Sequence, residues 1–136
     1  MLTRCHPSTA LEIAMIGYVT LGTNDMPRAA AFYDELFGES GVKRLMESDR
    51  YIFWGVSFDK PSLVMIKPFD GQPASVGNGV MVALVMNSRD KVDRLHAKAL
   101  ALGGSDEGAP GERGDGFYAG YFRDIEGNKL NAFCMG

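Results

Sequence analysis

The stretch MIGYVTLGTNDMPRAAAFYDELFG, residues 15–38, contains the pattern that decides the fold. Its first eight residues are mostly apolar, include β-branched side chains and stop at Gly22, which predicts a strand. The cluster 23–25 (Thr-Asn-Asp) follows as a helix-start signal, and Pro27 suits the first turn of a helix. Apolar residues then recur at three- and four-residue spacing up to Gly38, which is typical of a helix with one buried face. The stretch therefore predicts a strand followed by an amphipathic helix.

Three further β-like stretches follow, at 42–47, 51–58 and 62–67, with turn residues between them. The next segment is rich in Gly and Pro and has the composition of a linker. We therefore divide the chain into an N-terminal extension (1–14), a first β-α-β-β-β module (15–68), a linker (69–79) and a second module (80–136).

The second module repeats the first in a shifted register. Residues 80–86 predict a strand, Ser88 is the expected cap of a second helix, and that helix is expected to end at Gly103. Tyr18 and Met81 are 63 residues apart, whereas Trp54 and Tyr121 are 67 apart, so we expect about four extra residues in a long loop at 105–115. Strands are predicted at 116–123 and 129–135. Two copies of one module explain the alignment; two unrelated α+β halves that happen to align are the alternative.

Composition excludes several classes of protein. The 136 residues are 46% hydrophobic and 23% charged, with a net charge of −3. With no basic run longer than two residues, we expect neither a nucleic-acid partner nor a membrane anchor, and no apolar run is long enough to span a bilayer. Residues 1–14 lack the apolar core of a signal peptide. Cys5 and Cys134 are expected to be free thiols, or alternatively a disulfide joining the two ends, and we expect a cytoplasmic protein.

Three segments carry a resemblance to a known family: 17–38, 90–104 (DKVDRLHAKALALGG) and 120–133 (GYFRDIEGNKLNAF). They resemble the vicinal oxygen chelate superfamily, which includes glyoxalase I, bleomycin-resistance proteins and extradiol dioxygenases. The resemblance implies an α+β fold in which two βαβββ modules form a curved, mostly antiparallel sheet around a central cleft. It also implies a homodimer. Members differ widely in chemistry, so the fold alone does not name a reaction.

The same resemblance says where a metal would lie. Metal-using members take one ligand, usually His or Glu, from the first and last strand of each module. In this sequence those four positions are Tyr18, Val64, Met81 and Asn131. None is a histidine or a carboxylate, so we expect no metal and no other cofactor. The chain has only two histidines, His6 in the extension and His96 on a helix flank that we expect at the surface.

Strand alternation then predicts which residues face the cleft. The expected ligand contacts combine apolar side chains with a few polar tips: Tyr18, Thr20, Trp54, Val64, Met81, Tyr121, Asn131 and Phe133. Arg113 and Arg123 are candidates to contact an anionic group, Arg113 from a 105–115 loop that is either a lid or a solvated connector. The alternative is that these residues only fill the core.

Three functions follow from this site. The first is a glyoxalase- or bleomycin-resistance-like protein that binds a small organic ligand without metal. The second is a lactoylglutathione-lyase-like lyase or isomerase with a non-standard active site, for which we identify no catalytic residue because the predicted cleft lacks a base. The third is a homodimeric structural protein with a filled cleft.

Overall fold

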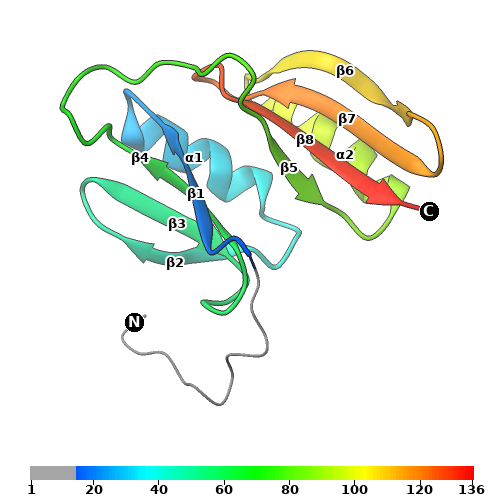
Figure 1. The fold of residues 1–136 in the computed structure, drawn as a ribbon, viewed down its shortest axis with the longest axis horizontal. Helices are drawn as coiled ribbons and strands as arrows, with labels where there is room; N and C mark the ends of the chain where they lie inside the picture. The colour runs from blue at the N-terminus through cyan, green and yellow to red at the C-terminus, as the bar shows by residue number, and fades with distance from the viewer. Residues whose placement is uncertain (1–14) are drawn as a thin grey trace.

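The computed structural model describes residues 15–136; the 1–14 extension, with Cys5 and His6, lies outside the described residues. The chain forms two βαβββ modules, as predicted, and the fold class is α+β (Figure 1). The first module has a four-stranded sheet in the order β1-β4-β3-β2, with β1 parallel to β4 and the other pairs antiparallel. Its elements are β1 (Tyr18–Gly22), α1 (Met26–Leu36), β2 (Lys43–Glu47), β3 (Tyr51–Gly55) and β4 (Ser62–Ile66).

The second module repeats this topology in the order β5-β8-β7-β6, with β5 parallel to β8. Its elements are β5 (Val82–Val85), α2 (Arg89–Ala101), β6 (Ser105–Glu112), β7 (Phe117–Arg123) and β8 (Lys129–Met135). The expectation of a loop or lid at 105–115 is wrong for most of its length. That segment forms β6, which pairs with β7 through irregularities in register around Gly108. Pairing with β7 gives the backbone of this segment hydrogen-bond partners, so it forms a strand although glycine and proline are unusual in one.

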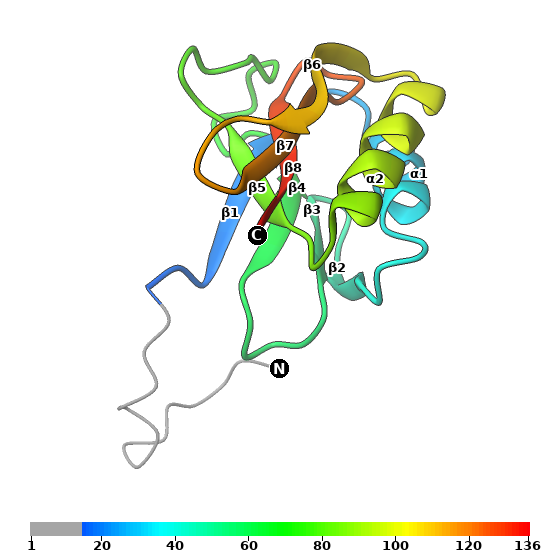
Figure 2. The same ribbon diagram turned by 90° about the vertical axis from the view of Figure 1, so that its right-hand side faces the viewer.

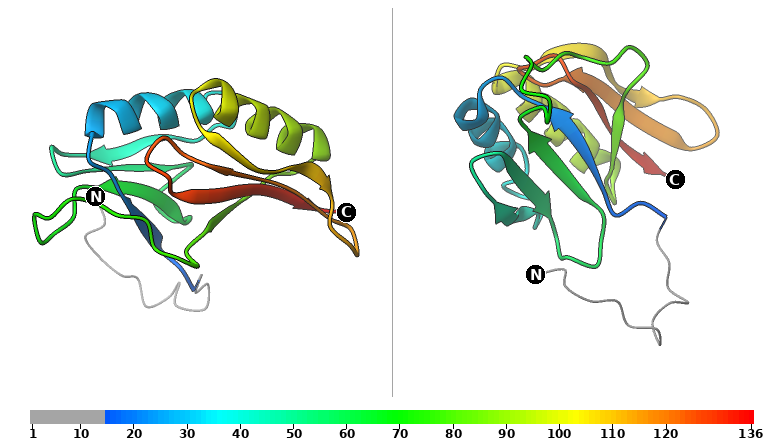
Figure 3. Two further views of the ribbon diagram at one scale, coloured as in Figure 1. Left: turned by 90° about the horizontal axis from the view of Figure 1, so that it is seen from above. Right: turned by 60° about the vertical axis from the view of Figure 1, so that its left-hand side comes forward.

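The two helices lie side by side on the same face of the sheets (Figures 2 and 3). Each begins at a polar cap: the side chain of Asp25 accepts from the backbone N of Arg28 at 3.1 Å, and that of Ser88 accepts from the backbone N of Lys91 at 3.2 Å. The main core fills the space between helices and sheets. No helix among residues 15–136 is long and apolar enough to cross a membrane.

His96 is buried, with 5% of its surface exposed, so its expected place at the surface is wrong. Its Nε2 lies 3.0 Å from Oδ1 of Asp106 and 3.1 Å from the carbonyl oxygen of Tyr121. Both partners accept, so Nε2 carries the proton and donates to them. The flank looked exposed in the sequence because β6, which contributes Asp106, was not predicted there.

The two modules meet at the turn between β7 and β8. The hydroxyl of Tyr33 on α1 donates to Oδ2 of Asp124 at 2.6 Å, and the pair is buried. Beside it, the hydroxyl of Thr23 donates to Oε2 of Glu126 at 2.6 Å. Burial and the negative charge of Asp124 raise the pKa of Tyr33 well above its ordinary value, so the phenol keeps its proton. These two hydrogen bonds link the first module to the second.

Candidate functional site

The candidate site lies on the face of the two sheets that the helices do not cover, hereafter the uncovered face, which is turned toward the viewer in Figure 1. Alternation along β8 defines it. Leu130, Ala132 and Cys134 point into the core, so Asn131 and Phe133 point the other way. In β1 the core residue is Leu21, which leaves Tyr18 and Thr20 on the uncovered face.

The first module places an aromatic group on this face. Tyr18 is 55% exposed and its ring lies 5.1 Å from that of Phe53, which in turn lies 5.6 Å from Tyr51. Thr20 pairs with Val64 across β1 and β4, and Val64 is fully buried. Sequence reasoning missed Phe53 and Tyr51, although they alternate with the core residue Ile52 in β3 and that signal could have found them.

Trp54 lies on the opposite face of the sheet, so the prediction that it contacts a ligand is wrong. It is 1% exposed, and its ring centroid lies 5.5 Å from that of Tyr33. Its indole Nε1 donates to Oδ1 of Asp34 at 3.0 Å. Because it packs against α1, Trp54 belongs to the core beneath the sheet.

The contacts of Asp34 predict that its contribution to the free energy of unfolding is lost in acid. Hydrogen bonds from the Arg44 guanidinium lower the pKa of Asp34 below its ordinary 3.8, against the opposing effect of partial burial. A carboxyl whose folded pKa is depressed stabilises the fold above its unfolded pKa, and that contribution is lost as the pH falls below about 4. Solvent screening limits it to about 0.5 kcal/mol.

We expect Asp34→Asn to flatten this part of the stability-against-pH curve, measured by urea unfolding followed through Trp54, the only tryptophan in the chain. An unchanged slope below pH 4 in the variant would contradict the assignment to Asp34.

In the second module Tyr121 and Asn131 are neighbours across β7 and β8, and Met81 lies just before β5. Met81 is 40% exposed, and Asn131 stands between Ala83 on β5 and Tyr121 on β7 in the strand register. Asn131 is 1% exposed, and its Oδ1 has no hydrogen-bond partner. It is the single buried side-chain polar atom without a partner in the described part of the chain. Phe133 lies farther along β8, with its ring 5.4 Å from that of Phe117.

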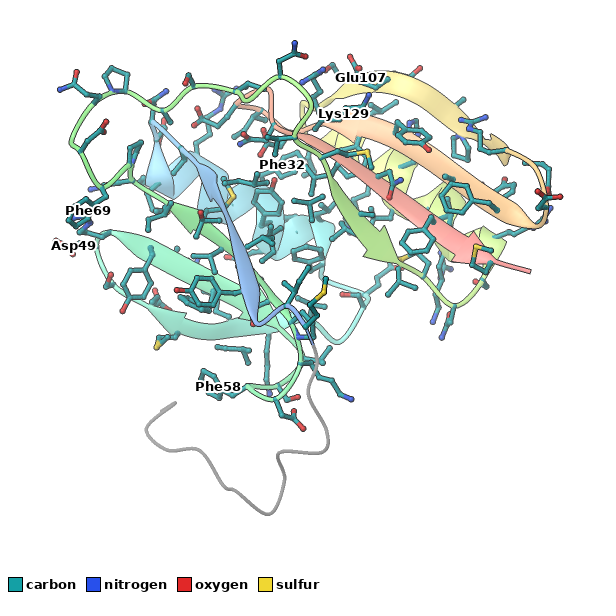
Figure 4. All side chains as sticks on the ribbon, viewed as in Figure 1. Phe32, Asp49, Phe58, Phe69, Glu107 and Lys129 are labelled. Carbon is teal, nitrogen blue, oxygen red and sulfur yellow. The ribbon has the colours of Figure 1, made fainter. Side chains whose placement is uncertain are left out.

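Charged groups surround Tyr121 on the same face. The guanidinium carbon of Arg113 lies 5.5 Å from the Tyr121 ring centroid, and Nζ of Lys129 lies 5.6 Å from it. Arg123 is engaged elsewhere: its Nε is 3.2 Å from Oε2 of Glu107, and its Nη1 donates to the carbonyl oxygen of Gly127 at 2.9 Å. Glu107 also approaches Lys129 at 3.7 Å (Figure 4).

Sequence reasoning missed both Lys129 and Glu107. Lys129 shares the alternation of Asn131 and Phe133, which could have identified it. Glu107 lies on β6, which sequence reasoning took for a loop, so its face was not predictable.

The family resemblance seen in the sequence is supported by a family model that covers most of the chain. The model of the Glyoxalase/Bleomycin resistance protein/Dioxygenase superfamily matches residues 15–132. The chain belongs to this superfamily. Its two βαβββ modules are therefore those of a glyoxalase-superfamily member, as the sequence resemblance predicted.

Solved structures of the superfamily share the fold. A glyoxalase/bleomycin resistance protein from Albidiferax ferrireducens is 32% identical, with a TM-score of 0.83 over 90% of this chain and 100% of that one. A lactoylglutathione lyase from Agrobacterium tumefaciens is 21% identical, with a TM-score of 0.66 over 89% of this chain and 92% of that one. No curated protein matches the chain. The second likeness is one of fold only.

The residues at the positions that the sequence resemblance assigns to metal ligands do not fit a catalytic divalent metal. Tyr18, Val64, Met81 and Asn131 offer a phenol, an alkyl group, a thioether and an amide. Hard divalent cations require oxygen donors and usually carboxylates, and an alkyl group has no lone pair to give. Nor do residues 15–136 contain any group of three His, Cys, Asp or Glu side chains that could hold a metal.

A pocket of about 70 Å³ lies away from this face, beside Leu36 and Leu95 of the two helices. None of the expected ligand contacts lines it.

Proposed function

We propose that this superfamily member binds a small organic ligand on the uncovered face, without a metal. The observation that carries the proposal is the amide oxygen of Asn131, buried and without a partner. Leaving a buried acceptor unsatisfied costs about 1–3 kcal/mol. A ligand that presents an N–H or O–H to this oxygen would recover that energy on binding.

The surrounding side chains favour an aromatic or amphipathic ligand. Tyr18 and Met81 expose apolar surface from the two modules, and Phe133 adds a half-buried ring beside Asn131. Small-molecule sites are lined mainly by apolar and aromatic side chains, with a few polar groups that orient the ligand. Thr20, Val64 and Tyr121 complete the proposed set of contacts.

A thermal-shift screen against aromatic and thiol-conjugated metabolites tests this function. A ligand at a hundred times its Kd adds about 2.7 kcal/mol to the stability of the protein that binds it, so we expect a rise in Tm of several degrees. The rise should shrink in Tyr18→Phe and in Asn131→Ala, and it should survive EDTA. Equal rises in all three proteins would contradict the site, and loss of the rise in EDTA would contradict metal-free binding.

A lyase or isomerase is the second candidate, and Glu107 favours it. The sequence-derived site lacked a base, whereas Glu107 lies 3.7 Å from Lys129, which shares a face with Asn131. A carboxylate can accept a proton from a substrate carbon, and a neighbouring cation can stabilise the negative charge that develops. Turnover of the methylglyoxal–glutathione hemithioacetal that Glu107→Gln abolishes would establish this candidate in place of simple binding.

A homodimer and a cytoplasmic location stay predictions. β1 and β5 are the edge strands of their sheets, and Tyr18 and Val85 on them are exposed. Unpaired edges with apolar side chains are common sites of association. Light scattering would measure the mass in solution; a dimer whose sites accept no ligand would favour the structural alternative.

A further inference from the structure

We propose that the ligand is an anion that also carries an N–H or O–H donor. Its anionic group lies beside Tyr121, between Arg113 and Lys129, and its donor reaches Oδ1 of Asn131. The inference rests on the proposed function and deepens it by naming the class of ligand.

Local charge on the uncovered face carries the first step. The whole chain has a net charge of −3, yet two cations, Arg113 and Lys129, lie against the Tyr121 ring. The carboxylate beside Lys129, that of Glu107, is also paired with a third cation, Arg123. A positive region on an acidic protein raises the local concentration of anions and lowers that of cations.

The cations differ in how many of their hydrogen-bond donors already have protein partners. Arg123 is committed to Glu107 and to the carbonyl oxygen of Gly127, so it is a poor choice for a ligand. Among the described residues, Arg113 has one hydrogen-bond acceptor, the carbonyl oxygen of Ala109 at 2.6 Å from its Nη2. A guanidinium has five N–H donors, so most of its capacity remains. The anion contact therefore shifts from the expected pair Arg113 and Arg123 to Arg113 and Lys129.

Glu107 opposes this placement only in part. Its carboxylate is closer to Arg123, at 3.2 Å, than to Lys129, at 3.7 Å. The ammonium of Lys129 has three donors and can serve Glu107 and a ligand together.

Strand geometry sets the size of the ligand. Tyr121 is directly opposite Asn131, and Lys129 is two residues before Asn131 on the same face. Neighbouring strands lie about 5 Å apart, and two residues along a strand span about 7 Å. The ligand's donor, at Oδ1 of Asn131, and its anionic group, beside Tyr121, are thus about 5–7 Å apart. A para-substituted benzoate spans this distance.

Titration of the full ¹⁵N-labelled chain with three matched probes tests the inference by NMR. 4-Hydroxybenzoate has both features, benzoate has only the charge, and 4-hydroxybenzyl alcohol lacks the charge. We expect 4-hydroxybenzoate to shift the amides of Tyr121 and Asn131 and to bind about fivefold or more tightly than either other probe, with the charge preference falling as salt is raised.

Variants assign the effect to residues. Arg113→Gln combined with Lys129→Gln should bring the affinity for 4-hydroxybenzoate within about twofold of that for 4-hydroxybenzyl alcohol, because the charge preference is then lost. Arg94→Gln, on the exposed side of α2, is the matched control and should change nothing.

The outcomes separate the two proposals. Equal binding of 4-hydroxybenzyl alcohol at the same amides would overturn the anion while leaving the proposed function intact. Benzoate binding as tightly as 4-hydroxybenzoate would overturn the donor to Asn131. If no probe moves the amides of β7 and β8 at millimolar concentration, the inference fails, and the thermal-shift screen decides the proposed function separately.

Discussion

Replacing Asp124 by alanine is expected to lower the free energy of unfolding by about 3–4 kcal/mol and the Tm by about 10 °C. Asp124 is 4% exposed and joins the two modules. One oxygen accepts from the Tyr33 hydroxyl at 2.6 Å and from Nδ2 of Asn128 at 3.1 Å; the other accepts from the backbone N of Glu126 and of Asn128, both at 2.9 Å. Alanine removes all four acceptor contacts and leaves buried donors without partners.

Tyr33→Phe is the matched control, because it removes only the contact between modules. We expect it to cost about 1–1.5 kcal/mol, the usual contribution of one hydrogen bond. Adding it to Asp124→Ala should cost less than the two separate losses combined, because the phenol has then already lost its partner. Urea unfolding of the four proteins measures the cycle. A loss below about 1 kcal/mol in Asp124→Ala would show that the modules do not depend on this turn.

The sequence predicted this turn but not its contact with the first module. The string Asp124 to Asn128 identified the turn itself, because its residue types are those of a tight turn. Its partner Tyr33 lies 91 positions away on α1. The helical spacing correctly placed Tyr33 in the core, but no local signal names a contact between modules.

The error at Trp54 came from a repeat alignment that was off by one residue in this strand. The 67-residue offset pairs Trp54 with Tyr121, yet the strand register pairs Trp54 with Leu63 and Phe122 with Leu130. Since Leu63 and Leu130 both point into the core, the structural counterpart of Trp54 is Phe122. The β7–β8 turn is therefore one residue shorter than the β3–β4 turn, and a shift of one residue moves a side chain to the opposite face.

β6 was missed for a different reason. Its sequence, SDEGAPGE, has no apolar alternation, and both Gly108 and Pro110 normally argue against a strand. Pairing with β7 creates the strand. The same omission hid Glu107 and made His96 look exposed. By contrast, Tyr18, Thr20 and Asn131 lie on the face that alternation predicted, because their strands follow a regular pleat.

Asn131→Leu is expected to raise the free energy of unfolding by about 1–2 kcal/mol while abolishing the ligand-induced rise in Tm. The substitution keeps the branched side chain of four heavy atoms and removes a buried oxygen that no group in the described chain satisfies. A buried polar group kept at a cost to stability is the pattern expected of a binding site, where function opposes stability.

Asn128→Leu provides a control of opposite sign. Asn128 is also a buried asparagine, but its Nδ2 donates to the carbonyl oxygen of Gly22 and to Oδ2 of Asp124, both at 3.1 Å. Losing these contacts should cost about 2 kcal/mol. Urea unfolding without ligand compares the two variants. If Asn131→Leu destabilises the protein as much as Asn128→Leu does, then the Asn131 oxygen already has a partner in the folded protein, and the ligand assigned to it loses its main support.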